Sequence, residues 1–120
     1  MAKKVKVKIH KKPKTDRIFD YVSNTRQLCE LFETREDRVL FSYFTFDHRL
    51  ADMTYGEFGR KIKNCAAALT SLGFAGKKIA VMGETSPEWL CMYFSILVTG
   101  GIVIPMDREL APEETAKFLE

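Results

Sequence analysis

Residues 78–106 read KIAVMGETSPEWLCMYFSILVTGGIVIPM, and this stretch decides the fold. Ile79 to Met82 is an uninterrupted apolar run, and Ile102 to Ile104 is a second one that Pro105 closes. A strand that is apolar on both faces is typical of a parallel sheet covered by helices. The segment between the two runs has helical character. We therefore predict a right-handed βαβ unit within a three-layer α/β fold with a partly parallel sheet.

The helix predicted between the two strands has clear signals at both ends. Ser86 can cap its first turn, and Pro87 suits the first helical position. The helix is expected to run to about Thr99, where Gly100 and Gly101 end it. Because its residues are apolar nearly all round, we expect it to be buried between layers.

A second helix is predicted upstream of this unit. Thr54 can cap it, and Glu57 three residues later completes a capping box. Gly73 ends it at a position that favours a positive φ. Its apolar residues recur at helical spacing and form one stripe, which consists of Phe58, Ile62, Cys65, Leu69 and Leu72.

Three shorter elements are predicted before the second helix. A first helix should run from about Thr25 to Arg35, and an aromatic-rich strand should run from Val39 to Phe46. Asp47 to Asp52 is polar and is predicted as a turn. The apolar face of the first helix consists of Leu28, Leu31 and Phe32.

The last predicted helix begins at Pro112 and carries Glu113 and Glu114 in its first turn. The sequence ends at Glu120, about two turns later. A helix with such clear start signals should lead to another strand. We therefore expect the chain to be truncated within a larger domain.

The charge of the chain is unevenly distributed. The formal net charge of the 120 residues is +3, yet the first fourteen residues hold seven lysines and no acid. This basic leader could suit a nucleic acid or an anionic membrane. No aromatic residue interleaves with the lysines, so we expect no nucleic-acid partner. We favour a solvated tail or an edge strand, because Val5, Val7 and Ile9 alternate with the lysines: Lys3, Lys4, Lys6, Lys8, Lys11, Lys12 and Lys14.

The three cysteines, Cys29, Cys65 and Cys91, are widely spaced and form no CxxC motif. A zinc site is therefore not expected, and each thiol should behave as a small buried hydrophobe in a reducing cytoplasm. The leader lacks the apolar run of a signal peptide. The long uncharged stretch from Trp89 to Met106 is predicted as a buried helix and strand, with no transmembrane segment.

Motifs for catalysis, cofactor binding or metal binding are not visible in the sequence. Its glycines match neither a dinucleotide-binding motif nor a P-loop. Ligands of open α/β sheets bind at the carboxyl ends of the strands, so Glu84 to Ser86 and Asp107 are candidates. We favour structural roles: Ser86 as a helix cap, Asp107 as a turn residue and Trp89 as part of the core. No catalytic, cofactor-binding or metal residue is assigned.

Several motifs resemble the adenylate-forming superfamily, which comprises acyl-CoA synthetases, adenylation domains of peptide synthetases and luciferases. Residues 54–58, TYGEF, resemble its first core motif, a Thr-Tyr-x-Glu-Leu pattern in which Phe58 replaces leucine. Residues 95–107, SILVTGGIVIPMD, resemble its second core motif, and GETSPEW at 83–89 is most similar to the long-chain fatty acid–CoA ligase branch. The resemblance covers residues 25–120, and its motifs agree in order and spacing.

This resemblance implies a two-step ligase that uses ATP, Mg and coenzyme A. ATP and a carboxylic acid, here a fatty acid, give an acyl-adenylate and pyrophosphate, and a thiol then takes the acyl group. The family's phosphate loop, adenine contacts and catalytic lysine lie downstream of the residues present here. The lysine-rich residues 1–14 form a basic leader that matches no part of the family. For residues 15–120 the resemblance implies the N-terminal part of an AMP-binding domain, truncated and inactive alone.

Two hypotheses for function follow. The chain is either the front of an acid–thiol ligase or a stand-alone interaction module that has lost catalysis. If the chain is truncated, missing downstream strands would leave an edge of the parallel sheet unpaired. We expect the chain to form a homo-oligomer, most simply a two-fold dimer, by strand addition or by packing of apolar faces, unless the leader folds back and caps the edge.

Overall fold

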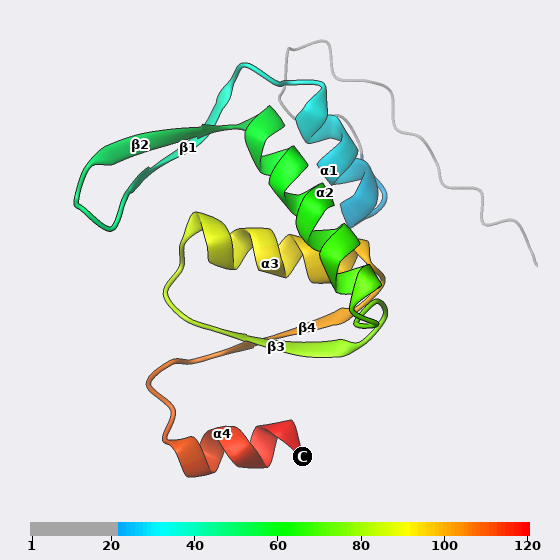
Figure 1. Cartoon of the computed structure of the whole chain (residues 1–120), viewed down its shortest axis with the longest axis vertical. Coiled ribbons are helices and arrows are strands. Elements are labelled where there is room, and N and C mark those ends of the chain that lie inside the picture. Colours follow the sequence, from blue (N-terminus) through cyan, green and yellow to red (C-terminus); the bar gives the residue numbers. More distant parts are fainter. Residues whose placement is uncertain (1–21) are drawn as a thin grey trace, which may run out of the picture.

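The structure is a computed structural model that describes residues 22–120 (Figure 1). The edge strand expected around Val5, Val7 and Ile9 lies outside the described residues. Helices and strands follow one another in the order α1 (Thr25–Glu33), β1 (Val39–Phe44), β2 (Leu50–Thr54), α2 (Tyr55–Ser71), β3 (Lys78–Met82), α3 (Pro87–Val98), β4 (Ile102–Met106) and α4 (Pro112–Leu119).

The predicted βαβ unit is confirmed. Strands β3 and β4 pair in parallel, with a register that runs from Lys78 opposite Ile102 to Met82 opposite Met106. Strand β4 continues through Pro105, where the sequence had predicted its end. A proline lacks the N–H that a central strand needs, but an edge strand tolerates it.

Helix α3 lies between α2 and the β3–β4 pair, as Figure 1 shows. All of its residues are buried or half-buried except Glu88, so the predicted burial between layers is confirmed. Helix α4 lies on the other side of the pair in Figure 1, and none of its residues is buried. The α/β class predicted from the sequence is correct.

Strand β2 corrects the sequence prediction. The turn predicted over Asp47 to Asp52 is shorter, because Leu50–Thr54 pairs antiparallel with β1. The strand alternates between its two faces: Met53 is buried in the core, and Asp52 faces solvent and accepts a hydrogen bond from the Ser42 hydroxyl. Two aspartates in a short segment suggested a turn, but one of them lies on the wet face of a half-buried strand.

The capping box of α2 is confirmed. The Thr54 hydroxyl accepts the Glu57 N–H at 3.2 Å, and the Glu57 carboxylate accepts the Thr54 N–H at 2.9 Å. These hydrogen bonds lower the pKa of the Glu57 carboxyl. The apolar stripe of α2 is buried or half-buried up to Leu69, but Leu72 is 70% exposed. Leu72 is the C-cap residue, where the chain leaves the helix before Gly73 takes a φ of 81°.

The turn from α3 to β4 requires its two glycines for different reasons. Gly100 has a φ of 79°, a conformation that other residues rarely adopt. Gly101 has no such φ, but a Cβ there would lie 2.7 Å from the Lys77 carbonyl oxygen and 3.0 Å from the Ile96 carbonyl oxygen. This close approach lets β4 begin directly beside β3.

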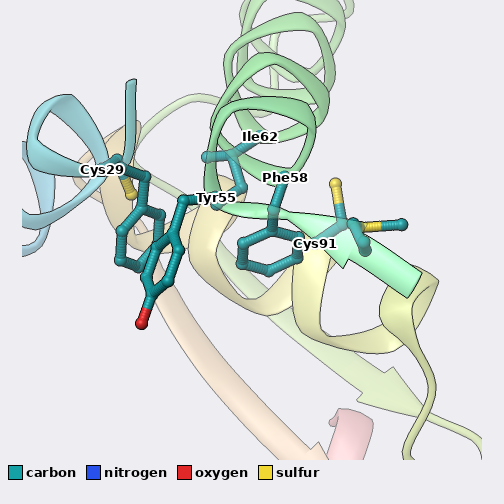
Figure 2. Packing of buried hydrophobic residues seen from close by; sticks show 7 residues of the cluster. Cys29, Tyr55, Phe58, Ile62 and Cys91 are labelled. Carbon is teal, nitrogen blue, oxygen red and sulfur yellow. The ribbon is translucent and has the colours of Figure 1, made fainter. Parts of the chain in front are cut away.

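Two clusters of buried residues form the core. One joins α1, the β1–β2 hairpin, α2 and α3 around Phe58 (Figure 2). The ring of Phe58 lies 5.5 Å from that of Phe41 and 6.0 Å from those of Phe32 and Phe94. The other joins α2, β3 and α3 through Leu69, Val81 and Ile96. Helices α2 and α3 contribute to both clusters.

We predict that Phe58→Ala lowers the free energy of unfolding by about 3–5 kcal/mol, because it leaves a cavity among three other rings. Phe58 is 2% exposed, whereas Phe46 at the end of the hairpin is 103% exposed. The matched control Phe46→Ala should change the value by less than about 0.5 kcal/mol. Urea unfolding of both variants measures the difference, and equal effects would contradict this assignment of the core.

Candidate functional site at the carboxyl ends of the parallel strands

The carboxyl ends of β3 and β4 bring together charged side chains from two loops. Glu84 follows β3, and its carboxylate pairs with the guanidinium of Arg108, which follows β4. The Nε of Arg108 also lies 3.2 Å from a carboxylate oxygen of Glu109. All three side chains are more than half exposed, so this network contributes little to stability.

Ser86 has the structural role that the sequence analysis favoured. Its hydroxyl accepts the Trp89 N–H at 3.1 Å and so caps α3. Pro87 occupies the first turn, where its missing N–H costs nothing, and Glu88 places a negative charge near the positive helix start. The Ser86 hydroxyl therefore serves the helix.

Asp107 is a turn residue, as expected. Its side chain accepts the Glu109 N–H at 2.9 Å, and its carbonyl accepts the Leu110 N–H at 3.3 Å. Both bonds hold the loop that leads from β4 to α4.

Trp89 packs on the core, as expected. It is half-buried against the cluster around Ile96, and its ring lies 5.4 Å from that of Tyr93. Its Nε1 is buried and finds no acceptor among residues 22–120. An unpaired buried donor costs about 1–3 kcal/mol, so any stabilisation from the indole comes from its apolar packing.

The three cysteines lie closer together than their spacing in the sequence suggested. Cys29 and Cys91 are buried and Cys65 is half-buried, so the prediction of small buried hydrophobes holds. Burial, then the neighbouring Cys91, raises the pKa of the Cys29 thiol to about 11. Burial also raises the pKa of Cys91, and Cys65 is among the groups that act on it. No local sequence motif predicts this cluster, because the three cysteines belong to three different helices.

The described residues show neither a metal cluster nor a membrane helix. Within residues 22–120, no group of three or more His, Cys, Asp and Glu side chains is arranged to hold a metal ion. None of the helices in that range combines the length and the apolar character that a membrane crossing needs.

Comparison with solved structures identifies the class of this fold. The structure of CmiS6 superimposes with a TM-score of 0.71 at 17% identity, over 89% of this chain and 28% of that one. A Mycobacterium tuberculosis fatty acyl CoA synthetase gives a TM-score of 0.65 at 23% identity, over 80% of this chain and 19% of that one. The chain has the α/β fold of the N-terminal domains of adenylate-forming ligases.

Sequence comparison then identifies the family. The family described as AMP-binding enzyme matches residues 30–120, and the chain belongs to it. A long-chain-fatty-acid–CoA ligase, FadD13 of Mycobacterium tuberculosis, is 31% identical over 68 residues, which are 56% of this chain and 14% of that protein. A crotonobetaine/carnitine–CoA ligase of Salmonella arizonae is 27% identical over 86 residues, 71% of this chain and 17% of that protein. The chain thus spans about a sixth of the length of these relatives.

We predict that Ser86→Ala lowers the free energy of unfolding by about 1 kcal/mol, because α3 loses its cap. The neighbouring change Glu84→Gln removes only an exposed ion pair and should lower the free energy of unfolding by about 0–1 kcal/mol. Thermal and urea unfolding of both variants measure the difference. A larger loss for Glu84→Gln would show that the ion pair, and not the cap, holds the strand ends.

Proposed function

We propose that this chain is the N-terminal part of an ATP-dependent acid–thiol ligase that acts through an acyl-adenylate. The match to the AMP-binding enzyme family over residues 30–120 carries this proposal. The matched range includes the motifs at 54–58 and 95–107, which lie at the start of α2 and across α3 and β4. The basic leader at 1–14 and the ligase part at 15–120 belong to the same proposal.

We propose that the described residues do not hold Mg and ATP by themselves. A phosphate cradle needs free backbone N–H groups at glycines, but Gly100 and Gly101 donate theirs to the carbonyls of Leu97 and Ile96. Arg108, the cation nearest the strand ends, is already paired with two carboxylates. We therefore assign this chain no catalytic step, and we propose that it supplies the packed scaffold on which the rest of the ligase domain folds.

A long-chain fatty acid is the substrate that we propose for the whole enzyme, with coenzyme A as the acceptor. The GETSPEW segment supports this choice, as do two long-chain ligases from Mycobacterium tuberculosis, FadD13 and FadD15, at 31% and 30% identity. A 4-hydroxybutyrate–CoA ligase of Metallosphaera sedula is 29% identical. Substrates of different size thus occur among relatives of similar identity. We also propose a cytoplasmic location, because all three cysteines are free.

The self-association expected from the sequence stays a prediction. Apolar side chains remain exposed on both strands of the parallel pair, at Met82 and Ile102, and at the hairpin end, at Phe44 and Leu50. Surfaces of this kind mark sites of association. A monomeric mass in light scattering would contradict the prediction.

We predict that the 120-residue chain exchanges no pyrophosphate into ATP with any acid, because its sequence shows no glycine-rich phosphate-binding motif. A protein that continues the same reading frame beyond Glu120 should exchange pyrophosphate, and faster with long-chain fatty acids than with 4-hydroxybutyrate or carnitine. Exchange by the isolated chain would contradict the assigned scaffold role. If the reading frame stops after Glu120, the alternative of a non-catalytic interaction module is supported.

A further inference from the structure

A buried serine joins α2 and α3 where the two helices cross. Ser95 of α3 is fully buried, and its hydroxyl lies 3.2 Å from the carbonyl oxygen of Ile62 in α2. A serine side chain is short, so the two helix backbones approach each other closely there. Any side chains next to this point on the facing surfaces of both helices are held near one another.

Two cysteines occupy these neighbouring positions. Cys65 lies one turn after Ile62, and Cys91 lies one turn before Ser95. Residues three or four apart share a helix face, so both thiols lie on the facing surfaces. Cys65 is among the groups that act on the Cys91 thiol, so the two side chains are neighbours. Figure 2 shows Cys91 beside Phe58, on the side of α3 that faces α2.

The same two cysteines line a pocket of about 320 Å³ between α2 and α3. The pocket opens to solvent beside Lys61. Burial raises the pKa of the Cys91 thiol, and the positive charge of Lys61 opposes part of that rise. Cys65 is half-buried, so a small molecule in the pocket reaches its sulfur first. Cys29 does not line this pocket, and it is buried in the core cluster around Phe58.

We propose that Cys65 and Cys91 form a peroxide-sensitive dithiol whose oxidation links α2 to α3 by a disulfide. The thiolate of Cys65 attacks one oxygen of a hydroperoxide, so an S–O bond forms and the O–O bond breaks. Protonation of the departing oxygen gives an alcohol, or water from hydrogen peroxide. The Cys91 thiolate then attacks the sulfenic sulfur of Cys65, the S–S bond forms, and the hydroxyl leaves as water. Two thiols and one hydroperoxide thus give one disulfide, one alcohol and one water, and an external thiol reduces the disulfide back to two thiols by exchange.

The disulfide would join the two helices at the crossing that both core clusters share. It therefore fixes the packing of α2 on α3, on which the parallel strands rest. This makes the site a modification site in the scaffold, distinct from the carboxyl ends of the strands where ligands of such folds bind.

Peptide mapping of the whole chain tests the proposal, because trypsin separates the three cysteines. Cys29 falls in residues 27–35, Cys65 in 64–77 and Cys91 in 79–108. The reduced, folded chain is treated with hydrogen peroxide, its remaining thiols are blocked with N-ethylmaleimide, and it is digested without reductant. We expect one linked pair, 64–77 with 79–108, while 27–35 carries the maleimide. Dithiothreitol should restore all three thiols.

Matched variants separate this pair from the other thiols. Cys29→Ser should keep the linked peptides, and Cys65→Ser should lose them, with circular dichroism confirming that both variants fold. Three results would overturn the proposal: linkage of 27–35 to either other peptide in the folded chain, a disulfide between two copies of the chain, or oxidation of single cysteines to sulfinic acid without linkage.

Discussion

The packing of α2 across α3 is the contact on which the rest of this structure depends. At its centre the buried Ser95 hydroxyl lies 2.6 Å from the Cys91 carbonyl oxygen of its own helix and 3.2 Å from the Ile62 carbonyl oxygen of α2. Its single proton can therefore be donated within the helix or across the crossing. A larger residue here would force the helices apart.

This crossing joins two parts of the molecule that the chain builds separately. On one side, α1 and the antiparallel β1–β2 hairpin pack around Phe58. On the other, the parallel β3–β4 pair packs through Val81 against Ile96. Because α2 and α3 supply residues to both clusters, neither part has a core of its own. The short hairpin and the two-stranded parallel sheet would each be marginal in isolation.

Caps, prolines and apolar runs in the sequence predicted the helices and strands that such short-range patterns determine. The capping box at Thr54 and Glu57, the proline after Ser86 and the apolar runs on either side of α3 were visible in the sequence and are present in the structure. The errors occur where the tertiary context decides. The sequence does not predict strand β2, because Met53 is buried only in a core that other elements complete. Leu72 has the spacing of the apolar stripe, but α2 ends before it. The Glu84–Arg108 pair and the thiol cluster were also missed, since each depends on which segments meet in space.

The absence of a catalytic assignment follows from the same architecture. At the carboxyl ends of the strands, Ser86 caps a helix and Asp107 holds a turn. At the amino end of β4, the two glycines after α3 donate hydrogen bonds back to that helix. In the function that we propose, this part of the AMP-binding family acts as a packed support, and its two core clusters meet at the crossing of α2 and α3.

Native-state hydrogen exchange tests this account most directly, by means of Ile96→Ala. Ile96 is fully buried and belongs only to the cluster that it forms with Leu69 and Val81. If the crossing joins both parts into one cooperative unit, Ile96→Ala should lower the free energy of opening at the slowest-exchanging amides of β1–β2 and of β3–β4 by the same amount, about 2–5 kcal/mol. Loss of protection in β3–β4 alone, with the hairpin unchanged, would contradict the claim that the α2–α3 crossing joins the two parts.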